Sequence, residues 1–183
     1  MMERMRTVNN TMPFRILTND PSLTAWGWAV MRSDNIVERV GCIKTSSENK
    51  VRRIRKGDDT VRRVSEINYE LLKIIRENNV NMILSELPHG SQNASSAVMM
   101  GIVTGIVQTI ADVLGLPIEW YSEADAKKCL IGRRSVSKGE TVRAITFEYT
   151  VPWKNVKYHD EAVADAIAIY HVAKSQSAIL RMR

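Results

Sequence analysis

Short apolar runs and longer helical repeats follow one another along this chain in an order that few folds accommodate. Three runs of strand length come first, joined by tight polar turns, at residues 14–19, 25–31 and 36–43. Three short strands connected in this way are typical of an antiparallel meander. Helical segments then alternate with two further apolar strands. This order predicts one α/β domain, in which helices flank a mixed sheet of five strands.

The later segments can be assigned from the spacing of their apolar residues. From Asp59 to about Asn78 these residues recur at helical intervals, and residues 91–114 form a second apolar helix that Gly115 and Pro117 end. Two buried strands and three shorter helices complete the expected fold, with the strands at residues 80–85 and 118–121 and the helices at residues 123–131, 138–149 and 160–173.

Length and composition limit the class of protein further. The 183 residues fit a single domain with a sizeable core, and we expect it at residues 14–173, between a flexible leader (1–13) and a mobile tail (174–183). No apolar stretch approaches the roughly 20 residues needed to cross a bilayer. The start of the chain also lacks the apolar core of a signal peptide. We therefore expect a cytoplasmic protein with no membrane partner.

Charge and cysteine content narrow the expected partners and cofactors. The net charge of +6 and the pI near 9.5 favour a polyanionic partner without establishing one. The two cysteines, Cys42 and Cys129, do not form a metal-binding pair, so zinc is not expected. We expect no organic cofactor either.

Four carboxylates stand where a strand or a helix would present them. Asp20 and Glu86 each end an apolar run, and Glu161 and Asp165 lie four residues apart, on one face of the last long helix. Oxygen ligands of this kind suit hard cations such as Mg²⁺ or Mn²⁺. If these three places converge, they form a divalent-metal site. In a basic chain, the natural substrate for such a site is a phosphodiester.

Each acid also has an ordinary structural interpretation. Asp20 stands before a Pro-Ser pair, as turn residues often do, and Glu86 could be a solvated acid at a strand end. Asp160 and Glu161 could offset the helix dipole in the first turn. Asp165 is different because alanine and isoleucine residues surround it in the helix, where a charge needs a partner. Taken together, the acids favour a metal site.

Several short motifs follow one another in a recognisable order. The first spans residues 20–24 and 27–30, and the last spans residues 164–169. Weaker ones lie between them, at residues 85–86, 92–97, 116–117, 126–132 and 137–138. In order and spacing, the set resembles the RuvC-type Holliday-junction resolvases over residues 14 to about 173. The resemblance implies a ribonuclease H-like fold and a homodimeric endonuclease that depends on Mg²⁺, for which Mn²⁺ is expected to substitute.

The resemblance assigns roles to individual acids. Three of the family's four metal-binding positions are matched, by Asp20, Glu86 and Asp165. At the fourth position, three residues before the final aspartate, the family has an acid or a histidine and this chain has Ala162. We take Glu161 as the fourth ligand because four-residue spacing keeps it on the same helix face. Asp160 is a weaker candidate.

Basic residues near this site are expected to contact DNA. Lys127 and Lys138 match the family's two basic residues near the active site, and the chain between them adds Lys128, Arg133 and Arg134. Such charges would hold phosphates around the scissile bond. Lys138 could also open a helix, where a phosphate gains from both charge and amide donors. For Lys128, a solvated surface position is an equally good interpretation.

Two further features extend the resemblance. His89 falls where the family carries an aromatic residue that reaches into the junction, and a histidine there could stack on a base. An exposed loop histidine is the alternative. Gly101 and Gly105 lie four residues apart and permit close helix approach. That approach is either to the core or to a second copy, as in the family, where the corresponding helix lines the dimer interface.

The expected function is resolution of four-way DNA junctions by two-metal-ion hydrolysis, with paired nicks from a homodimer. Lys138 joins the four acids as a catalytic residue. One alternative is a nuclease of the same fold that acts on branched, flapped or RNA-containing DNA, because a fold does not fix a substrate. The other is a non-catalytic junction-binding structural protein, which the shift of the fourth acid to Glu161 would favour.

Overall fold

The computed structural model describes residues 13–182, so the expected leader lies outside the described residues except for its last position. A meander of strands comes first, and helices and strands then alternate. The strands are β1 (Arg15–Asp20), β2 (Ala25–Arg32), β3 (Val37–Lys44), β4 (Met82–Glu86) and β5 (Ile118–Tyr121). The helices are α1 (Asn49–Arg52), α2 (Lys56–Glu77), α3 (Ala94–Leu114), α4 (Glu123–Ile131), α5 (Lys138–Glu148), α6 (Lys157–Gln176) and α7 (Ala178–Arg181).

The five strands form one mixed sheet in the order β3-β2-β1-β4-β5. The first three strands pair antiparallel, as the sequence predicted, while β4 pairs in parallel with both β1 and β5. The predicted α/β fold with a mixed five-stranded sheet is therefore confirmed. Because β1 and β4 are parallel neighbours, their carboxyl ends lie at the same edge of the sheet.

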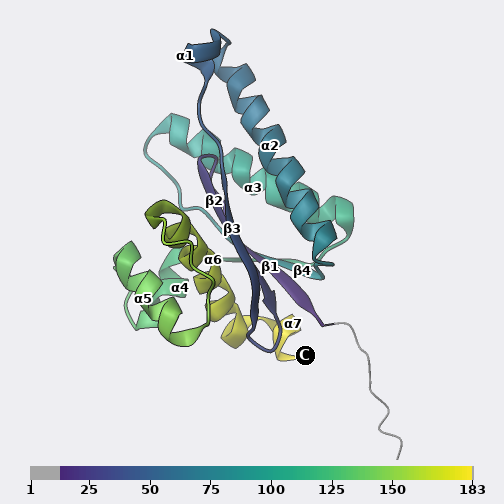
Figure 1. The fold of residues 1–183 in the computed structure, drawn as a ribbon, viewed down its shortest axis with the longest axis vertical. Coiled ribbons are helices and arrows are strands. Elements are labelled where there is room, and N and C mark those ends of the chain that lie inside the picture. Colours follow the sequence, from purple (N-terminus) through teal and green to yellow (C-terminus); the bar gives the residue numbers. More distant parts are fainter. Residues whose placement is uncertain (1–12, 183) are drawn as a thin grey trace, which may run out of the picture.

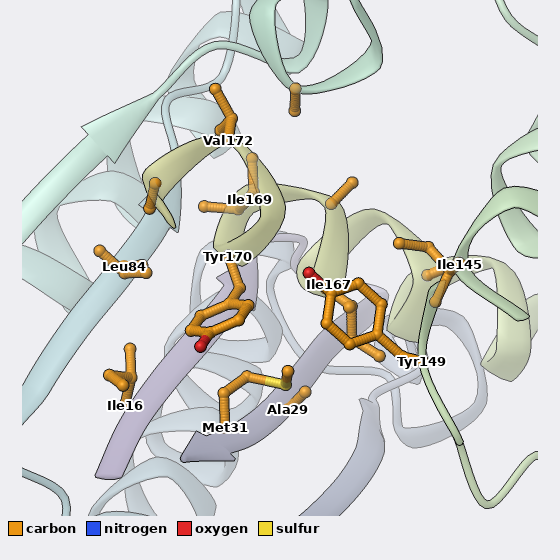
Figure 2. Packing of buried hydrophobic residues seen from close by; sticks show 14 of the residues in the cluster. Ile16, Ala29, Met31, Leu84, Ile145, Tyr149, Ile167, Ile169, Tyr170 and Val172 are labelled. Carbon is orange, nitrogen blue, oxygen red and sulfur yellow. The ribbon is translucent and has the colours of Figure 1, made fainter. Parts of the chain in front are cut away.

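Helices cover both faces of the sheet (Figure 1). Side chains of β1 alternate between these faces: Ile16 packs into a cluster with α6, and Leu17 packs into a second cluster with α2 and α3. Figure 2 shows the first cluster, in which Met31 of the sheet lies near Ile167 and Tyr170 of α6. Burial of the two clusters fixes the face to which each residue of β1 and β4 points.

Helix α6 lies directly on the sheet, and most of its residues are buried. The hydroxyl of Thr18 in β1 donates a hydrogen bond to the carbonyl oxygen of Ala166, at 2.5 Å. On β2, a Cβ at Gly27 would stand 2.0 Å from the carbonyl oxygen of Ala162, so only glycine allows the helix to come this close. These contacts hold α6 in one position and thereby fix where its polar residues face.

Helix α3 is long and apolar, and much of it is exposed. By length and composition alone it could cross a membrane, although a single helix of this kind is weak evidence because core helices of soluble proteins share these features. The expectation that no stretch of the chain approaches this length and apolarity is therefore wrong. An exposed apolar face is also what a subunit interface presents.

The segment that the sequence predicted as a tail, residues 174–183, makes several contacts with the domain in its described part. Helix α6 continues beyond residue 173, and the buried Ser177 then caps α7 by accepting a hydrogen bond from the Leu180 amide. The same hydroxyl donates to Glu119 of β5, at 2.9 Å. Ile179 and Leu180 pack against the core. The described part of this segment is thus docked on the domain.

Candidate active site

Asp20 and Glu86 end neighbouring strands on the same face of the sheet. Strands β1 and β4 pair in parallel almost to their last residues, so the two acids come to the same edge. Strand alternation puts Asp20 on the side of Ile16 and Glu86 on the side of Leu84. Both of those apolar residues pack in the cluster that contains α6. The two acids therefore face α6 at the edge of the sheet.

Asp165 reaches this edge from helix α6. It is only 7% exposed, and most of the residues around it in the helix are buried. Its Oδ2 atom lies 3.1 Å from Nζ of Lys138, which opens α5. The apolar surroundings of Asp165 predicted that its charge would need a partner, and Lys138 supplies one.

The start of α5 is fixed by a capping box. The Ser137 side chain accepts a hydrogen bond from the Glu140 amide, and the Glu140 carboxylate accepts one from the Ser137 amide. Lys138 follows as the first residue of the helix, as the sequence predicted. Two backbone amides that would lack a partner at the helix start are hydrogen-bonded in this way. The cap therefore fixes the start of α5, and with it the position of Lys138 beside α6.

Burial and mutual repulsion raise the pKa values of the three acids. The pKa of Asp20 rises from its usual 3.8 to about 7, first through burial and then through Asp165. The pKa of Glu86 rises from 4.5 to about 9, first through burial and then through Asp20. Burial also raises the pKa of Asp165, against the opposing charge of Lys138. The acids therefore act on one another as one cluster.

The chemistry of this cluster fits a divalent cation. Carboxylate oxygens are hard ligands, and a cation among them would relieve the repulsion that raises their pKa values. At present the ammonium group of Lys138 offsets part of that repulsion. Within residues 13–182, no three His, Cys, Asp or Glu side chains lie close enough together to coordinate a metal ion as they stand. The acids thus supply suitable donors in a more open arrangement.

The raised pKa values predict how the stability of the metal-free protein depends on pH. Between the unfolded value of 4.5 and the folded value of about 9, the folded protein keeps a proton on Glu86 that the unfolded chain releases. This contribution to stability is complete below the unfolded value and is lost as the pH rises through the folded one. In the presence of a chelator, the melting temperature should therefore decrease between about pH 6 and about pH 9.

Added Mg²⁺ should raise the melting temperature more at the upper end of this range, because a cation binds the ionised acids. The variant Glu86→Gln is the control, because it removes the acid whose pKa is raised further than that of Asp20. Its melting temperature should depend less on pH. A melting temperature that stays constant or increases over this range in the metal-free protein would contradict the shifted values.

The two candidates for a fourth ligand on α6 are placed differently. Glu161 is half-buried, and its charge acts on Lys138. Asp160 is buried, and its Oδ1 accepts a hydrogen bond from the Lys154 amide at 3.1 Å and lies 3.1 Å from Nδ1 of His159. Asp160 therefore holds the loop before α6, in keeping with its structural interpretation. Glu161 stays a prediction.

Sequence reasoning missed one acid at this site, Glu123. It is the first residue of α4, it forms an ion pair with Lys127, and its charge raises the pKa of each of the three acids described above. In the sequence, Glu123 resembles an ordinary acid in the first turn of a helix. The signal that could have found it is the pairing of β5 with β4, which brings the start of α4 to the same edge.

The basic residues proposed for DNA contact differ in exposure. Lys127 is buried in its ion pair with Glu123, whereas the others are exposed, namely Lys128, Arg133, Arg134 and Lys138. Arg133 pairs with Glu140 of the capping box. His89 is exposed as well, and together with Glu86 it lines an open groove of about 530 Å³.

A mixed five-stranded sheet, with acids at the ends of two adjacent strands and on the helix packed across them, is the arrangement implied by the resemblance to nucleases of the ribonuclease H-like fold. Comparison with known proteins narrows this class. The family model for the crossover junction endodeoxyribonuclease RuvC matches residues 16–171. The chain therefore belongs to the RuvC family, and the function predicted from the sequence, a junction-resolving endonuclease, is confirmed at the level of the family.

Individual relatives agree with this assignment. The crossover junction endodeoxyribonuclease RuvC of Gluconobacter oxydans is 27% identical over 167 residues, which cover 90% of this chain and 93% of the relative. The structure of T. thermophilus RuvC in complex with a Holliday junction substrate matches with a TM-score of 0.65 and 19% identity, over 87% of this chain and 92% of that one. The yeast mitochondrial Holliday junction resolvase Ydc2 matches with a TM-score of 0.62 and 12% identity, over 93% and 81% of the two chains. These structures support the fold.

Proposed function

We propose that this protein cleaves four-way DNA junctions as a homodimer, using Mg²⁺ bound by the acids at the edge of its sheet, and that it works in the cytoplasm. The observation that carries the proposal is the cluster of Asp20, Glu86 and Asp165, three acids from separate elements that repel one another inside the fold. Such repulsion is costly unless a cation offsets it. Membership of the RuvC family supports the junction as the substrate.

In this proposal, Asp20, Glu86 and Asp165 hold the metal, with Glu161 as the fourth ligand that the sequence suggests. Bound Mg²⁺ would supply an activated water and stabilise the departing 3′ oxygen, and Mn²⁺ is expected to substitute for it. The acids fix the orientation of the site because strand ends and a buried helix hold them. Lys138 stands beside them and adds positive charge where the scissile phosphate would lie.

Lys138→Ala is expected to slow cleavage about 10- to 100-fold at saturating junction, since a charged group that stabilises the transition state is lost. The free energy of unfolding should decrease by about 1 to 3 kcal/mol, because Asp165, whose side chain is only 7% exposed, loses its hydrogen-bond partner. Single-turnover rates and urea denaturation measure the two effects separately.

Lys157→Ala is the matched control for this change, since Lys157 is also an exposed lysine at the first position of a helix, α6. It should leave the cleavage rate unchanged. If Lys138→Ala cleaves at the wild-type rate in moderate salt, Lys138 does not act in the site.

The exposed basic residues are proposed to hold the DNA backbone around this site. Lys128, Arg133 and Arg134 lie between the two lysines of the site, on or just after α4, and each phosphate that they neutralise should steepen the salt dependence of binding. Lys127 contributes from its buried position next to Glu123. His89 is proposed to stack on a base from the groove that it shares with Glu86.

The exposed apolar face of α3 supports a homodimer. Val98 is 57% exposed and Val113 is 77% exposed, which is unfavourable for a helix that remains in water. A Cβ at Gly101 or Gly105 would meet no atom within 4 Å, so both glycines face outward and permit close approach of a second helix. A symmetric pair of copies would present two active sites to two opposed strands of a junction.

A supercoiled plasmid with an extruded cruciform tests the activity and the dimer together. Paired cuts within one encounter convert this plasmid directly to the linear form, whereas independent cuts accumulate nicked circles first. We expect linear product without a nicked intermediate. Equal cutting of flaps or RNA–DNA hybrids would favour the broader nuclease of the same fold. Junction binding without any cutting would favour the structural protein.

A further inference from the structure

The α6 position that would carry a fourth acid is occupied by Ala162, which packs against β2. Ala162 is 4% exposed, and its carbonyl oxygen lies where a Cβ of Gly27 would be. Gly27 is in turn the register partner of Asp20. The helix therefore approaches the strand most closely beside the metal-site acid, at a residue that has no donor side chain. A fourth carboxylate must therefore come from another position.

Helix α4 brings a carboxylate to this edge from the other side. Strand β5 pairs in parallel with β4, and Tyr121 at its end lies beside Glu86. Ser122 then caps α4 by accepting a hydrogen bond from the Asp125 amide, so the helix begins at Glu123 immediately beyond the strand end. Glu86 and Glu123 both line the same open groove. Glu123 is thus placed by the same sheet edge that places Asp20 and Glu86.

Each of the two acids that face this edge from α4 and α6 is paired with a lysine. Glu123 pairs with Nζ of Lys127, as Asp165 pairs with Nζ of Lys138, so each acid that comes from a helix is balanced by one ammonium group. The Lys127 side chain is only 11% exposed, and the Glu123 side chain is 40% exposed. A divalent cation could take over the balancing charge at both acids and release the two lysines toward a phosphate.

Glu161 is less well placed for this role. Its charge acts on Lys138, as does the charge of Asp165. By contrast, Glu123 is among the main charges that act on each of the other three acids. Glu123 also lines the groove that Glu86 lines, and Glu161 is not among the residues that line it.

We propose that Glu123 of α4 is the fourth carboxylate of the metal site, in place of an acid at position 162. The inference rests on the proposed function, since it assumes that Asp20, Glu86 and Asp165 bind the metal. It moves the fourth ligand from α6 to the first turn of α4. Metal binding would then join the end of β5 to the two strands and to α6.

Mn²⁺ binding to the DNA-free protein, measured by calorimetry, tests this assignment without depending on activity. Glu123→Gln keeps the size of the side chain and removes its charge, and it should weaken Mn²⁺ binding by about 10- to 100-fold or more, at least the range seen when groups supporting a metal ligand are lost. Asp125→Asn is the matched control, since Asp125 is an exposed acid in the same first turn of α4, and it should leave the affinity unchanged. Glu161→Gln tests the other candidate for the fourth ligand, and the proposal expects it to change the affinity by less than about 5-fold. A large loss in Glu161→Gln with none in Glu123→Gln would overturn the proposal.

A double-variant cycle separates metal ligation from an indirect effect through Lys127. If Glu123 only positions that lysine, combining Glu123→Gln with Lys127→Met should weaken Mn²⁺ binding no more than Lys127→Met alone. The proposal requires a further loss of Mn²⁺ affinity in the double variant.

The variant Asp20→Asn separates failure of the metal site from failure of the role proposed for Glu123. Unchanged Mn²⁺ binding in Asp20→Asn would contradict the metal site itself, whereas loss there with none in Glu123→Gln would contradict only the role of Glu123.

Discussion

Replacing Asp20 by asparagine is expected to reduce junction cleavage by at least about 1,000-fold, or about 4 kcal/mol in the activation free energy. Asp20 ends the central strand β1, between Gly27 on one side and the strand of Glu86 on the other. The acid is therefore at the middle of the cluster. Asparagine has the same shape but lacks the charge that a divalent cation requires.

Binding and folding should survive this change. The residues proposed to contact DNA lie on other elements, so Asp20→Asn should bind a labelled junction as the wild type does in the absence of metal. Because repulsion from Asp165 helps to raise the pKa of Asp20, removing the charge should leave the metal-free protein at least as stable at alkaline pH. Single-turnover cleavage, a binding titration and a melting curve give the three values. Cleavage at the wild-type rate would remove Asp20 from the metal site.

Adding one methyl group at Gly27 is expected to destabilise the fold by about 3 kcal/mol or more. The new Cβ would lie 2.0 Å from the carbonyl oxygen of Ala162 and 2.9 Å from its Cβ. Backbone of a buried helix cannot move aside as a flexible side chain can. Relief requires α6 to shift from the sheet, and this shift would carry Asp165 away from Asp20. Urea denaturation of Gly27→Ala measures the loss.

Gly57→Ala is the control for this prediction. Gly57 lies in the first turn of α2, where a Cβ would meet no atom within 4 Å. Alanine there should be neutral or stabilise the protein by up to about 1 kcal/mol. A free energy of unfolding for Gly27→Ala within experimental error of the wild type would contradict the close packing of α6 on β2.

Local patterns in the sequence were sufficient for much of the fold and for three of the acids. Strand-length apolar runs that end in Asp20 and Glu86 predict where those residues lie, because strand alternation and parallel pairing are regular. Asp165 could be found from chemistry alone, since a charge on an apolar helix face needs a partner. Lys138 was predicted from the family resemblance, and the serine three residues before a glutamate marks the helix start at which it lies.

Other features depend on contacts between distant segments. The pairing of β5 with β4 brings Glu123 to the same edge of the sheet as Glu86. The sequence around Glu123 shows only an ordinary helix start. The docking of the chain end depends on Ser177 reaching Glu119, which lies 58 residues earlier. The role of Gly27 depends on α6, more than 100 residues later in the chain. Such pairings leave no periodic signal in one sequence.

The most direct test is cleavage of a labelled synthetic four-way junction by the wild-type protein, with and without Mg²⁺, beside a linear duplex of the same sequence. The account predicts symmetric nicks in two opposed strands of the junction, only when Mg²⁺ is present, and no comparable cutting of the duplex. Cleavage that persists in chelator, or equal cleavage of junction and duplex, would contradict a metal-dependent, junction-selective nuclease.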